Sequence, residues 1–243
     1  MSAKIKYGLL GRNIAYSFSR GYFAQKFADL GLDAVYENYD VPDLQNLRQI
    51  FETPGLKGLN VTIPYKEAVI EHLTRLSGAA KKIGAVNTIS FESDGPVGHN
   101  TDYIGFSKSL APHLKDIHKK ALILGHGGAA KAVAYALETL GIGHEYVTRS
   151  GDGLRYGDLT TQMIAERKIV INTTPLGTFP QTDACPEIPY EGFSSHHIAF
   201  DLIYNPPQTE FLNRAGARGA TILNGYEMLV GQAEAAWSIW QGE

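Results

Sequence analysis

The chain has 243 residues and a formal net charge of −3. Hydrophobic residues make up 44% and charged residues 19%, which is typical of a globular protein with one large or two small cores. The composition offers no basic surface for nucleic acid, and the apolar runs are too short to cross a bilayer. We therefore expect neither a nucleic-acid partner nor a membrane association.

The first residues and the cysteine content predict the compartment. The N-terminal sequence MSAKIKYGLLG leads directly into a strand pattern and lacks the architecture of a signal peptide. Cys185 is the only cysteine, so the chain forms no intramolecular disulfide, which is typical of a reducing compartment. The eight histidines show no metal-ligand spacing. The sequence thus predicts a cytoplasmic protein without a metal site.

Short strand-like and helix-like segments alternate through residues 1–101. Strands are expected at 6–10, 34–39 and 58–62, helices at 21–30, 41–51 and 67–76, a short turn at 79–82, and a hairpin formed by 86–91 and 96–99. This alternation predicts an α/β layer structure with a mainly parallel sheet.

The rest of the chain repeats the same alternation. A helix is expected at 103–114, strands at 121–124, 144–148, 168–171, 197–204 and 221–223, and further helices at 131–140, 209–217 and 227–240. Strands alternating with helices predict a second α/β domain with a parallel sheet.

A glycine-rich turn opens this second part. The apolar run 121–124 enters a G-x-G-x-x-A pattern, and a helical pattern follows, which is the context expected for a dinucleotide site. Gly125 permits the tight turn, Gly127 lets the backbone approach a pyrophosphate, and Ala130 lets the helix pack close to the strand. An ordinary glycine-rich β–α turn is the alternative. Because about a hundred residues precede this turn, we expect a substrate domain to come first.

The end of the strand predicted at 144–148 bears on the choice of dinucleotide. An acidic residue there binds the ribose 2′-hydroxyl of NAD, whereas an arginine favours the 2′-phosphate of NADP. Arg149 occupies this position, and Glu145 lies at the other end of the strand. We therefore predict NADP(H), with a solvated surface charge as the alternative role of Arg149. The loops at 172–177 and 205–207 follow strands and are expected to border the cofactor.

Polar residues cluster at three places in the first part of the chain: Ser17 and Ser19; Asn60, Thr62 and Lys66; and Asn87 with Asn100, Thr101 and Asp102. Each cluster alone has an ordinary interpretation as helix caps and turns. Lys66, in the first turn of a predicted helix, opposes the helix dipole slightly, and such inconsistencies are more frequent at functional sites. Together the clusters suit an oxygen-rich substrate and a ketone reduction, in which a lysine beside a carboxylate delivers the proton and a nicotinamide carries the hydride.

The order of these motifs resembles the shikimate dehydrogenase family along nearly the whole chain. The most specific match is N-V-T-I-P-Y-K at 60–66, which is similar to the family's N-V-T-x-P-[FY]-K. Further matches are G-A-V-N-T at 84–88, N-T-D at 100–102, the glycine loop, T-R-S at 148–150 and N-G-Y-E-M-L-V-G-Q at 224–232.

The resemblance implies NADPH-dependent, reversible reduction of 3-dehydroshikimate to shikimate, in the pathway to chorismate and the aromatic amino acids. It implies Lys66 and Asp102 as the catalytic pair. The substrate contacts that it implies are Ser17, Ser19, Thr62, Asn87, Tyr204 and Gln232. The cofactor contacts that it implies are Gly125, Gly127, Gly128, Ala129, Thr148, Arg149, Ser150, Asn172, Leu202, Gly225 and Met228.

The resemblance also implies the architecture: an N-terminal α/β substrate domain plus a Rossmann-like, doubly wound NADP-binding domain, with a cleft between them. Because the last helix returns to the first domain in such enzymes, residues 1–101 plus 225–243 are expected to form the substrate domain and 102–224 the NADP domain. A monomer or a homodimer is expected, with a small-molecule substrate.

The chain departs from the family pattern at several positions. In the first loop Asn13, Tyr16 and Arg20 replace a proline, a histidine and a second proline; Arg20 either points to solvent or strengthens the hold on a carboxylate. His126 lies where alanine is common, and the segment 149–168 is short, which leaves fewer basic residues to grip a 2′-phosphate. Two alternatives remain open: a quinate or quinate/shikimate dehydrogenase that uses NAD, and a non-catalytic, NADP-binding regulator of the same fold.

Overall fold

The computed structural model describes residues 4–15 and 17–242, so Tyr16 lies outside the described residues. The chain divides into two compact units. The first unit consists of Met1–Thr101 and Ala233–Glu243, and the second of Asp102–Gln232.

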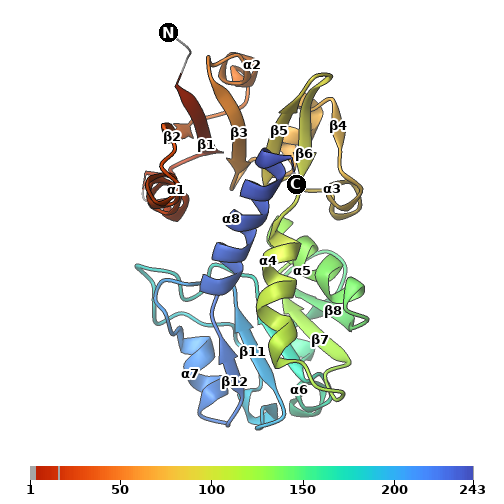
Figure 1. Ribbon diagram of the computed structural model, residues 1–243. Coiled ribbons are helices and arrows are strands. Elements are labelled where there is room, and N and C mark those ends of the chain that lie inside the picture. The colour runs from red at the N-terminus through yellow and green to blue at the C-terminus, as the bar shows by residue number, and fades with distance from the viewer. Residues whose placement is uncertain (1–3, 16, 243) are drawn as a thin grey trace. The chain divides into compact units, whose positions relative to one another are not determined.

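The first unit is built on a six-stranded mixed sheet (Figure 1). Its strands, in the order β2-β1-β3-β5-β6-β4, are β1 (Ile5–Gly11), β2 (Ala34–Asp40), β3 (Leu56–Val61), β4 (Arg75–Leu76), β5 (Thr88–Glu92) and β6 (Gly95–His99). The helices of this unit are α1 (Phe18–Asp29), α2 (Leu47–Phe51), the 3₁₀-helix η1 (Ala68–His72) and α3 (Gly78–Ile83). Strands β1, β2 and β3 pair in parallel, while β5 pairs antiparallel with both β3 and β6, so the hairpin predicted from the sequence is confirmed.

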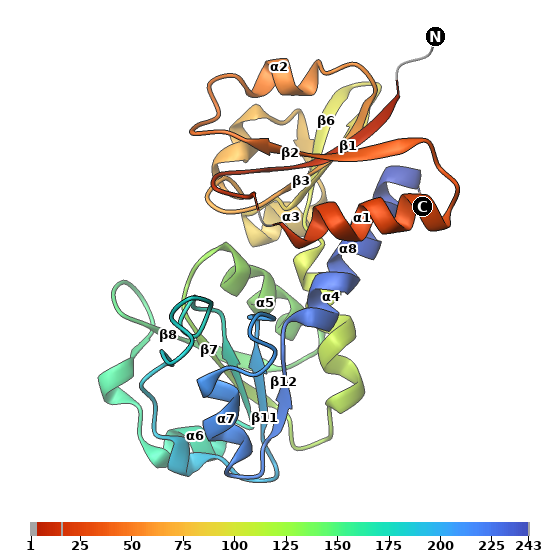
Figure 2. The same cartoon turned by 90° about the vertical axis from the view of Figure 1, so that its left-hand side faces the viewer.

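Helices cover both faces of this first sheet, as Figure 2 shows for α2 on one side and α1 on the other. Residues of α2, η1 and α3 pack on one face, around Leu59 and Ile89. On the other face, α1 and the end of α8 (Tyr226–Gln241) enclose an aromatic cluster that includes Phe23, Tyr36 and Trp240. The Trp240 indole also donates a hydrogen bond to the Ile89 carbonyl at 3.0 Å, which fixes the last turns of α8 to the first unit.

The second unit is built on a parallel sheet in the order β12-β11-β10-β7-β8-β9. Its strands are β7 (Lys120–Leu124), β8 (Gly143–Thr148), β9 (Leu154–Arg155), β10 (Ile169–Asn172), β11 (Ile198–Asp201) and β12 (Thr221–Leu223). The sheet consists of two halves, β7-β8-β9 and β10-β11-β12, that run outward from the centre. This order is characteristic of dinucleotide-binding folds, in which ligands bind beyond the carboxyl ends of the strands near the point of reversal.

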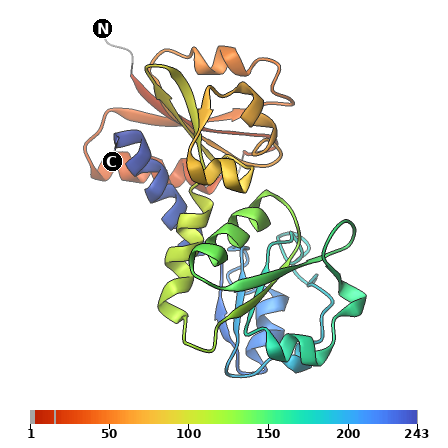
Figure 3. The ribbon, with the colours of Figure 1, turned by 90° about the vertical axis from the view of Figure 1, so that its right-hand side faces the viewer.

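Helices on both faces make the second unit doubly wound. Figure 3 shows α4 (Asp102–Leu110) and α5 (Gly128–Thr139), in yellow-green and green, on one side of the strands. The other face packs against α6 (Thr161–Glu166) and α7 (Glu210–Gly216). Short 3₁₀-helices complete the unit: η2 (Ala111–His113), η3 (Tyr156–Asp158) and η4 (Tyr190–Gly192). The predicted α/β fold class is therefore confirmed.

The prediction of a helix at 67–76 is wrong. Only the short η1 forms there, and the chain then extends into β4, which pairs in parallel with β6. Hydrogen bonds from Thr74 N to Pro96 O at 2.9 Å and from Ser77 N to Gly98 O at 2.8 Å hold this edge. Pairing with a strand about twenty residues away thus overrides the local helical pattern.

Three predicted elements are shorter than expected. In the segment 41–51 only α2 is helical. The residues before it form a turn that follows Pro42, in which the Asp43 side chain accepts a hydrogen bond from Gln45 N at 2.9 Å, and this turn delays the start of the helix. The strand predicted at 197–204 ends at Asp201, and the helix predicted at 103–114 ends at Leu110 before η2. Strand β9 and helix α6 were not predicted from the sequence. No helix among the described residues is both long and apolar enough to cross a membrane.

Candidate functional site

A buried polar network crosses the first unit beneath the predicted substrate residues. The Tyr36 hydroxyl donates to Asn60 Oδ1 at 2.7 Å, and Asn60 Nδ2 donates to Asn87 O and Thr88 Oγ1, each at 3.3 Å. Burial raises the pKa of Tyr36, which a hydrogen bond with Ser19 partly offsets, so the phenol stays protonated as a donor. The network therefore connects Ser19 on α1 with Asn87 before β5.

Asn87 also binds the last residue of the first unit. Thr101 N donates to Asn87 Oδ1 at 2.6 Å, and Asn87 Nδ2 donates to Thr101 Oγ1 at 2.9 Å. Asp102, the next residue along the chain, begins α4. Two hydrogen bonds from one amide thus determine where the backbone lies immediately before the predicted catalytic carboxylate.

Lys66 lies in a turn, and the prediction that it occupies the first turn of a helix is wrong, since η1 begins at Ala68. The backbone around it is held by hydrogen bonds from Thr62 N to Leu10 O at 2.9 Å and from Val86 N to Lys66 O at 2.7 Å. Thr62 and Lys66 therefore follow the carboxyl end of β3, next to the carboxyl end of β1. The Lys66 ammonium therefore does not oppose a helix dipole from within the first turn of a helix.

Replacing Tyr36 with phenylalanine is expected to weaken substrate binding and the stability of the first unit. The change leaves Asn60 Oδ1 without its buried donor, which costs about 1–3 kcal/mol. We expect a lower urea midpoint by tryptophan fluorescence, because Trp237 and Trp240 both belong to this unit, and a higher KM for the predicted substrate. Tyr39→Phe, on the same strand, removes hydrogen bonds of a half-buried hydroxyl with Glu37, at 3.4 Å, and with Thr53, but none to the buried network, and is the control. Equal effects of the two changes would contradict the network's role.

The glycine loop of the second unit has the shape that a pyrophosphate requires. Gly125 has φ of +110°, and a Cβ there would lie 2.6 Å from Thr173 Oγ1, so only glycine is accommodated. A Cβ at Gly127 would meet nothing within 4 Å, so open space lies beside the loop. Gly127 caps α5 without a side-chain hydrogen bond, and no acidic residue lies in the first turn of that helix. The first amide groups of α5 are thus available to an anion, as a dinucleotide needs.

The predicted residues for the adenosine end follow β8. Thr148 is buried, whereas Arg149 and Ser150 are exposed. The loop from the glycine turn and the end of β8 are adjacent, since Gly125 N donates to Val147 O at 2.9 Å. The structure therefore brings Gly125 and Thr148 together at the carboxyl ends of β7 and β8, and Arg149 follows Thr148 directly.

A second group of predicted cofactor residues meets at the ends of β10, β11 and β12. Leu202 N donates to Asn172 O at 3.0 Å, and Gly225 N donates to Ile203 O at 3.0 Å. A Cβ at Gly225 would clash with Leu202 O, so glycine allows this close approach. Met228, one turn into α8, packs in the core of this unit. Tyr204 lies on the loop after β11, with its side chain exposed.

A buried carboxylate that the sequence analysis missed holds these strand ends together. Asp201 Oδ1 accepts from Asn172 Nδ2 and from Ile203 N, both at 3.1 Å, and its Oδ2 accepts from Thr209 Oγ1 at 2.6 Å. Burial raises the pKa of Asp201 to about 6, although the three hydrogen bonds oppose that shift. A charged residue at the end of the apolar run I-A-F was the signal in the sequence.

Asp201 makes the second unit less stable as the pH rises from about 4 to about 6. Its folded pKa of about 6 lies above the usual aspartate value of 3.8, so the native state keeps a proton that the unfolded chain has lost. The resulting loss of unfolding free energy is about 3 kcal/mol across this range. Asp201→Asn removes this titration. The difference in unfolding free energy between the variant and the wild type, measured by circular dichroism in urea, should therefore shift in favour of the variant as the pH rises. For Asp183→Asn, at an exposed position, the difference in unfolding free energy from the wild type should not change with pH. If the difference for Asp201→Asn did not change with pH either, Asp201 would not be the group that titrates.

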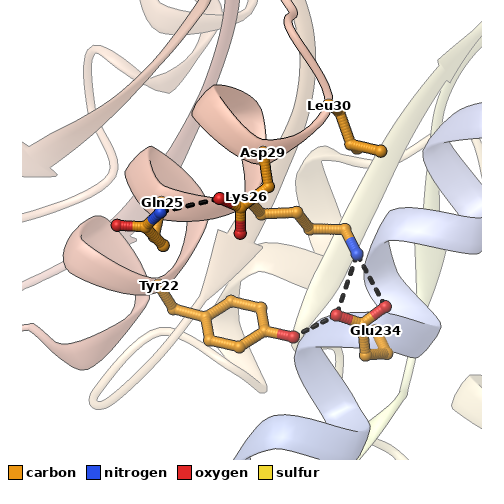
Figure 4. Close-up of a pocket in the computed structure, with 6 residues that line it drawn as sticks. All are labelled: Tyr22, Gln25, Lys26, Asp29, Leu30 and Glu234. Carbon is orange, nitrogen blue, oxygen red and sulfur yellow. Dashed lines mark hydrogen bonds and ion pairs between the residues drawn. The ribbon is translucent and has the colours of Figure 1, made fainter.

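A pocket of about 270 Å³ lies between α1 and α8 within the first unit (Figure 4). Lys26 Nζ donates to both carboxylate oxygens of Glu234, at 2.8 and 2.9 Å, and the Tyr22 hydroxyl donates to the same carboxylate. Gln25 donates to Asp29 at 2.8 Å. These polar groups bind one another, and no residue predicted for the site lines the pocket. The hydrogen bonds of Tyr22 and Lys26 with Glu234 connect α1 with α8.

Three of the residues that depart from the family pattern, Asn13, Arg20 and His126, lie among the described residues. Asn13 has φ of 58°, and the backbone amides of Asn13 and Ile14 donate to the Asp40 carboxylate at 2.8 and 3.0 Å, which holds the first loop without proline. Arg20 is exposed on α1. The His126 ring is also exposed and lies edge-on to Tyr146, with ring centroids 4.7 Å apart. Among the described residues, no group of three or more His, Cys, Asp or Glu could hold a metal ion.

Comparison with known proteins gives the family. Residues 9–89 match the shikimate dehydrogenase substrate binding domain. The shikimate dehydrogenase (NADP(+)) of Clostridium beijerinckii is 41% identical over 248 residues, which cover 97% of this chain and 91% of that protein.

Solved structures agree over the full length. The shikimate 5-dehydrogenase of Thermus thermophilus in complex with NADP(H) and shikimate has a TM-score of 0.87 and 33% identity, covering 98% of this chain and 94% of that one. The quinate dehydrogenase of Corynebacterium glutamicum in complex with NAD has a TM-score of 0.87 and 28% identity, covering 99% and 94%. On this identity and coverage, the chain belongs to the shikimate dehydrogenase family.

Proposed function

We propose that this protein is an NADP-dependent shikimate dehydrogenase, which reversibly reduces 3-dehydroshikimate to shikimate on the route to chorismate. The observation that carries the proposal is the full-length similarity to NADP-dependent shikimate dehydrogenases. The open glycine loop and the arginine after β8 support the same cofactor. The pathway role and the single cysteine favour a cytoplasmic location.

The proposal assigns residues 1–101 plus 225–243 to a substrate domain and 102–224 to an NADP domain. Two observations support it: the family's substrate-binding domain matches residues 9–89, and the strand order of the second unit is that of dinucleotide-binding folds. The compact units divide the chain within α8, after Gln232, so the start of that helix belongs by its packing to the second unit.

Lys66 and Asp102 form the catalytic pair in this proposal. The ammonium of Lys66 delivers a proton to the ketone oxygen as that oxygen gains negative charge, and the carboxylate of Asp102 orients the reacting hydroxyl group and assists the transfer. Bound NADPH supplies the hydride. The backbone contact of Lys66 with Val86 and the hydrogen bonds between Asn87 and Thr101 support the pair, because they order both segments of the chain.

The substrate's carboxylate and hydroxyl groups need hydrogen-bond partners in a buried site. We assign these contacts to Ser17, Ser19, Thr62, Asn87, Tyr204 and Gln232. We assign the cofactor contacts to Gly125, Gly127, Gly128, Ala129, Thr148, Arg149, Ser150, Asn172, Leu202, Gly225 and Met228. The amide groups that begin α5 suit the pyrophosphate, and Arg149 suits the 2′-phosphate.

A second candidate is oxidation of quinate with NAD. This candidate is supported by the TM-score of the Corynebacterium quinate dehydrogenase, which equals that of the Thermus enzyme. The arginine after β8 and the higher identity to NADP-dependent relatives favour shikimate and NADP.

Steady-state kinetics with each combination of shikimate or quinate and NADP or NAD tests the proposal. We expect the highest kcat/KM for shikimate with NADP. A higher value for NAD, or for quinate, would replace the first proposal with the second.

A further inference from the structure

One buried side-chain amide orders the loop that follows β10. Asn172 and Asp201 are both fully buried and lie opposite one another at the ends of β10 and β11. Asn172 Oδ1 accepts from Thr174 N at 3.0 Å and from Thr174 Oγ1 at 2.7 Å. Asn172 Nδ2 donates to Asp201 Oδ1 at 3.1 Å and to Leu176 O at 3.4 Å. An amide has two N–H donors and two lone pairs on its oxygen, so the loop and Asp201 use all of them.

The loop 173–177 begins against the glycine turn. Thr173 donates twice to Leu124 O, from its N at 3.0 Å and from its Oγ1 at 2.7 Å. Leu124 precedes Gly125, at which a Cβ would lie 2.6 Å from Thr173 Oγ1. Strands β7 and β10 are adjacent at the centre of the sheet, where its order reverses and where this fold binds a dinucleotide. Because the adenosine end is assigned to β8, on the far side of β7, the loop after β10 belongs to the nicotinamide side.

Asp201 also holds two further segments beside this loop. Its Oδ1 accepts from Ile203 N at 3.1 Å, and Ile203 O accepts from the N of Gly225, directly before α8, at 3.0 Å. Its Oδ2 accepts at 2.6 Å from the hydroxyl of Thr209, the N-cap of α7. The end of the loop 173–177 packs on the same threonine, since a Cβ at Gly177 would lie 3.4 Å from Thr209 Cβ. One carboxylate therefore connects the loop after β10, the loop after β11 and the start of α7.

We propose that Asp201 is a positioning residue for the nicotinamide half of the cofactor, which acts by holding Asn172 and Ile203. This inference rests on the proposed use of NADP. Asp201 acts through these neighbours and not on the reacting atoms. Loops that are already ordered before the cofactor arrives lose less entropy when they bind it, so the buried carboxylate adds affinity for the nicotinamide half.

Calorimetric titration of the full-length protein with NADPH and with adenosine 2′,5′-bisphosphate separates the two halves of the cofactor. In Asp201→Ala we expect the affinity for NADPH to fall about 5- to 100-fold, because Asn172 Nδ2 and Ile203 N lose their buried acceptor. The affinity for the bisphosphate, which lacks the nicotinamide, should stay unchanged. Asp201→Asn should restore most of the affinity for NADPH, because the amide oxygen can accept the same two hydrogen bonds.

Thr174→Val tests the same loop without removing a buried carboxylate. It deletes the hydroxyl that donates to Asn172 Oδ1 and accepts from Leu176 N, while Thr174 N keeps its own bond. We expect the affinity for NADPH to fall about 2- to 10-fold and that for the bisphosphate to stay unchanged. Ser194→Ala is the control, because it removes a hydroxyl that bonds to His197 Nδ1 at 3.0 Å near the opposite end of β11. It should bind both ligands like the wild type.

Two results would overturn the inference. Equal losses for NADPH and the bisphosphate would mean that the network supports the second unit as a whole. Unchanged affinity for NADPH would mean that the loops are ordered without it. If Asp201→Ala did not fold, Thr174→Val would decide between the same outcomes. A failure of the proposed function would appear instead in the wild type, as NADPH that binds without being oxidised by 3-dehydroshikimate.

Discussion

Replacing Lys66 with methionine is expected to lower kcat about 10²–10⁴-fold, the usual contribution of a positioned acid–base group. Methionine keeps the length of the apolar stem but cannot hold or transfer a proton. NADPH affinity should remain unchanged, because every cofactor contact that we assign lies in the second unit or in α8. Single-turnover NADPH oxidation and calorimetric NADPH titration measure the two quantities.

Lys57→Met is the matched control, since Lys57 is an exposed lysine on β3 of the same unit. It should retain full turnover. Normal turnover in Lys66→Met would exclude Lys66 from the chemistry, and an equal loss in both variants would indicate a general effect of charge on the first unit.

Replacing Asp102 with asparagine is expected to lower kcat about 10²–10⁴-fold as well, because the amide has nearly the same shape but cannot accept a proton. The amide keeps the size of this buried side chain, and the loss of its charge from the first turn of α4 removes a helix-dipole contribution of about 0.3–1 kcal/mol. The fold should therefore survive, as circular dichroism can verify.

The control for this variant is Asp116→Asn, an exposed aspartate of the second unit. A catalytic Asp102 predicts that the pH profile of kcat changes in Asp102→Asn and stays as in the wild type in Asp116→Asn. If Asp102→Asn turned over substrate at the wild-type rate, the carboxylate would have no part in proton transfer.

The elements that the sequence predicted well are those whose signal is local. The apolar run before Gly125 and the small residues after it encode a strand, a turn and a helix within one short stretch, and β7 and α5 form there. By contrast, β4 exists only because it pairs with β6, and β9 only because it pairs with β8. A two-residue edge strand has no periodicity of its own, so the local pattern of the segment 67–76 predicts a helix instead.

The residues of the candidate site likewise divide into those with a local sequence signal and those that depend on partners distant in the chain. Lys66 and Asp102 stand in contiguous motifs, so the resemblance can propose them from the sequence alone. Tyr36 and Asp201 act through partners distant in sequence: the Tyr36 hydroxyl binds Asn60, and the Asp201 carboxylate binds Asn172. Only the folded chain reveals such pairs, because the same residue types are common in strands and turns.

The most direct test of the whole account is one turnover of the wild-type protein. Enzyme loaded with NADPH is mixed with 3-dehydroshikimate, nicotinamide absorbance is followed, and the product is identified by chromatography. The account predicts that one shikimate forms for each NADPH consumed. A protein that binds NADPH tightly but neither consumes it nor forms shikimate would contradict the account and would indicate a non-catalytic regulator of the same fold.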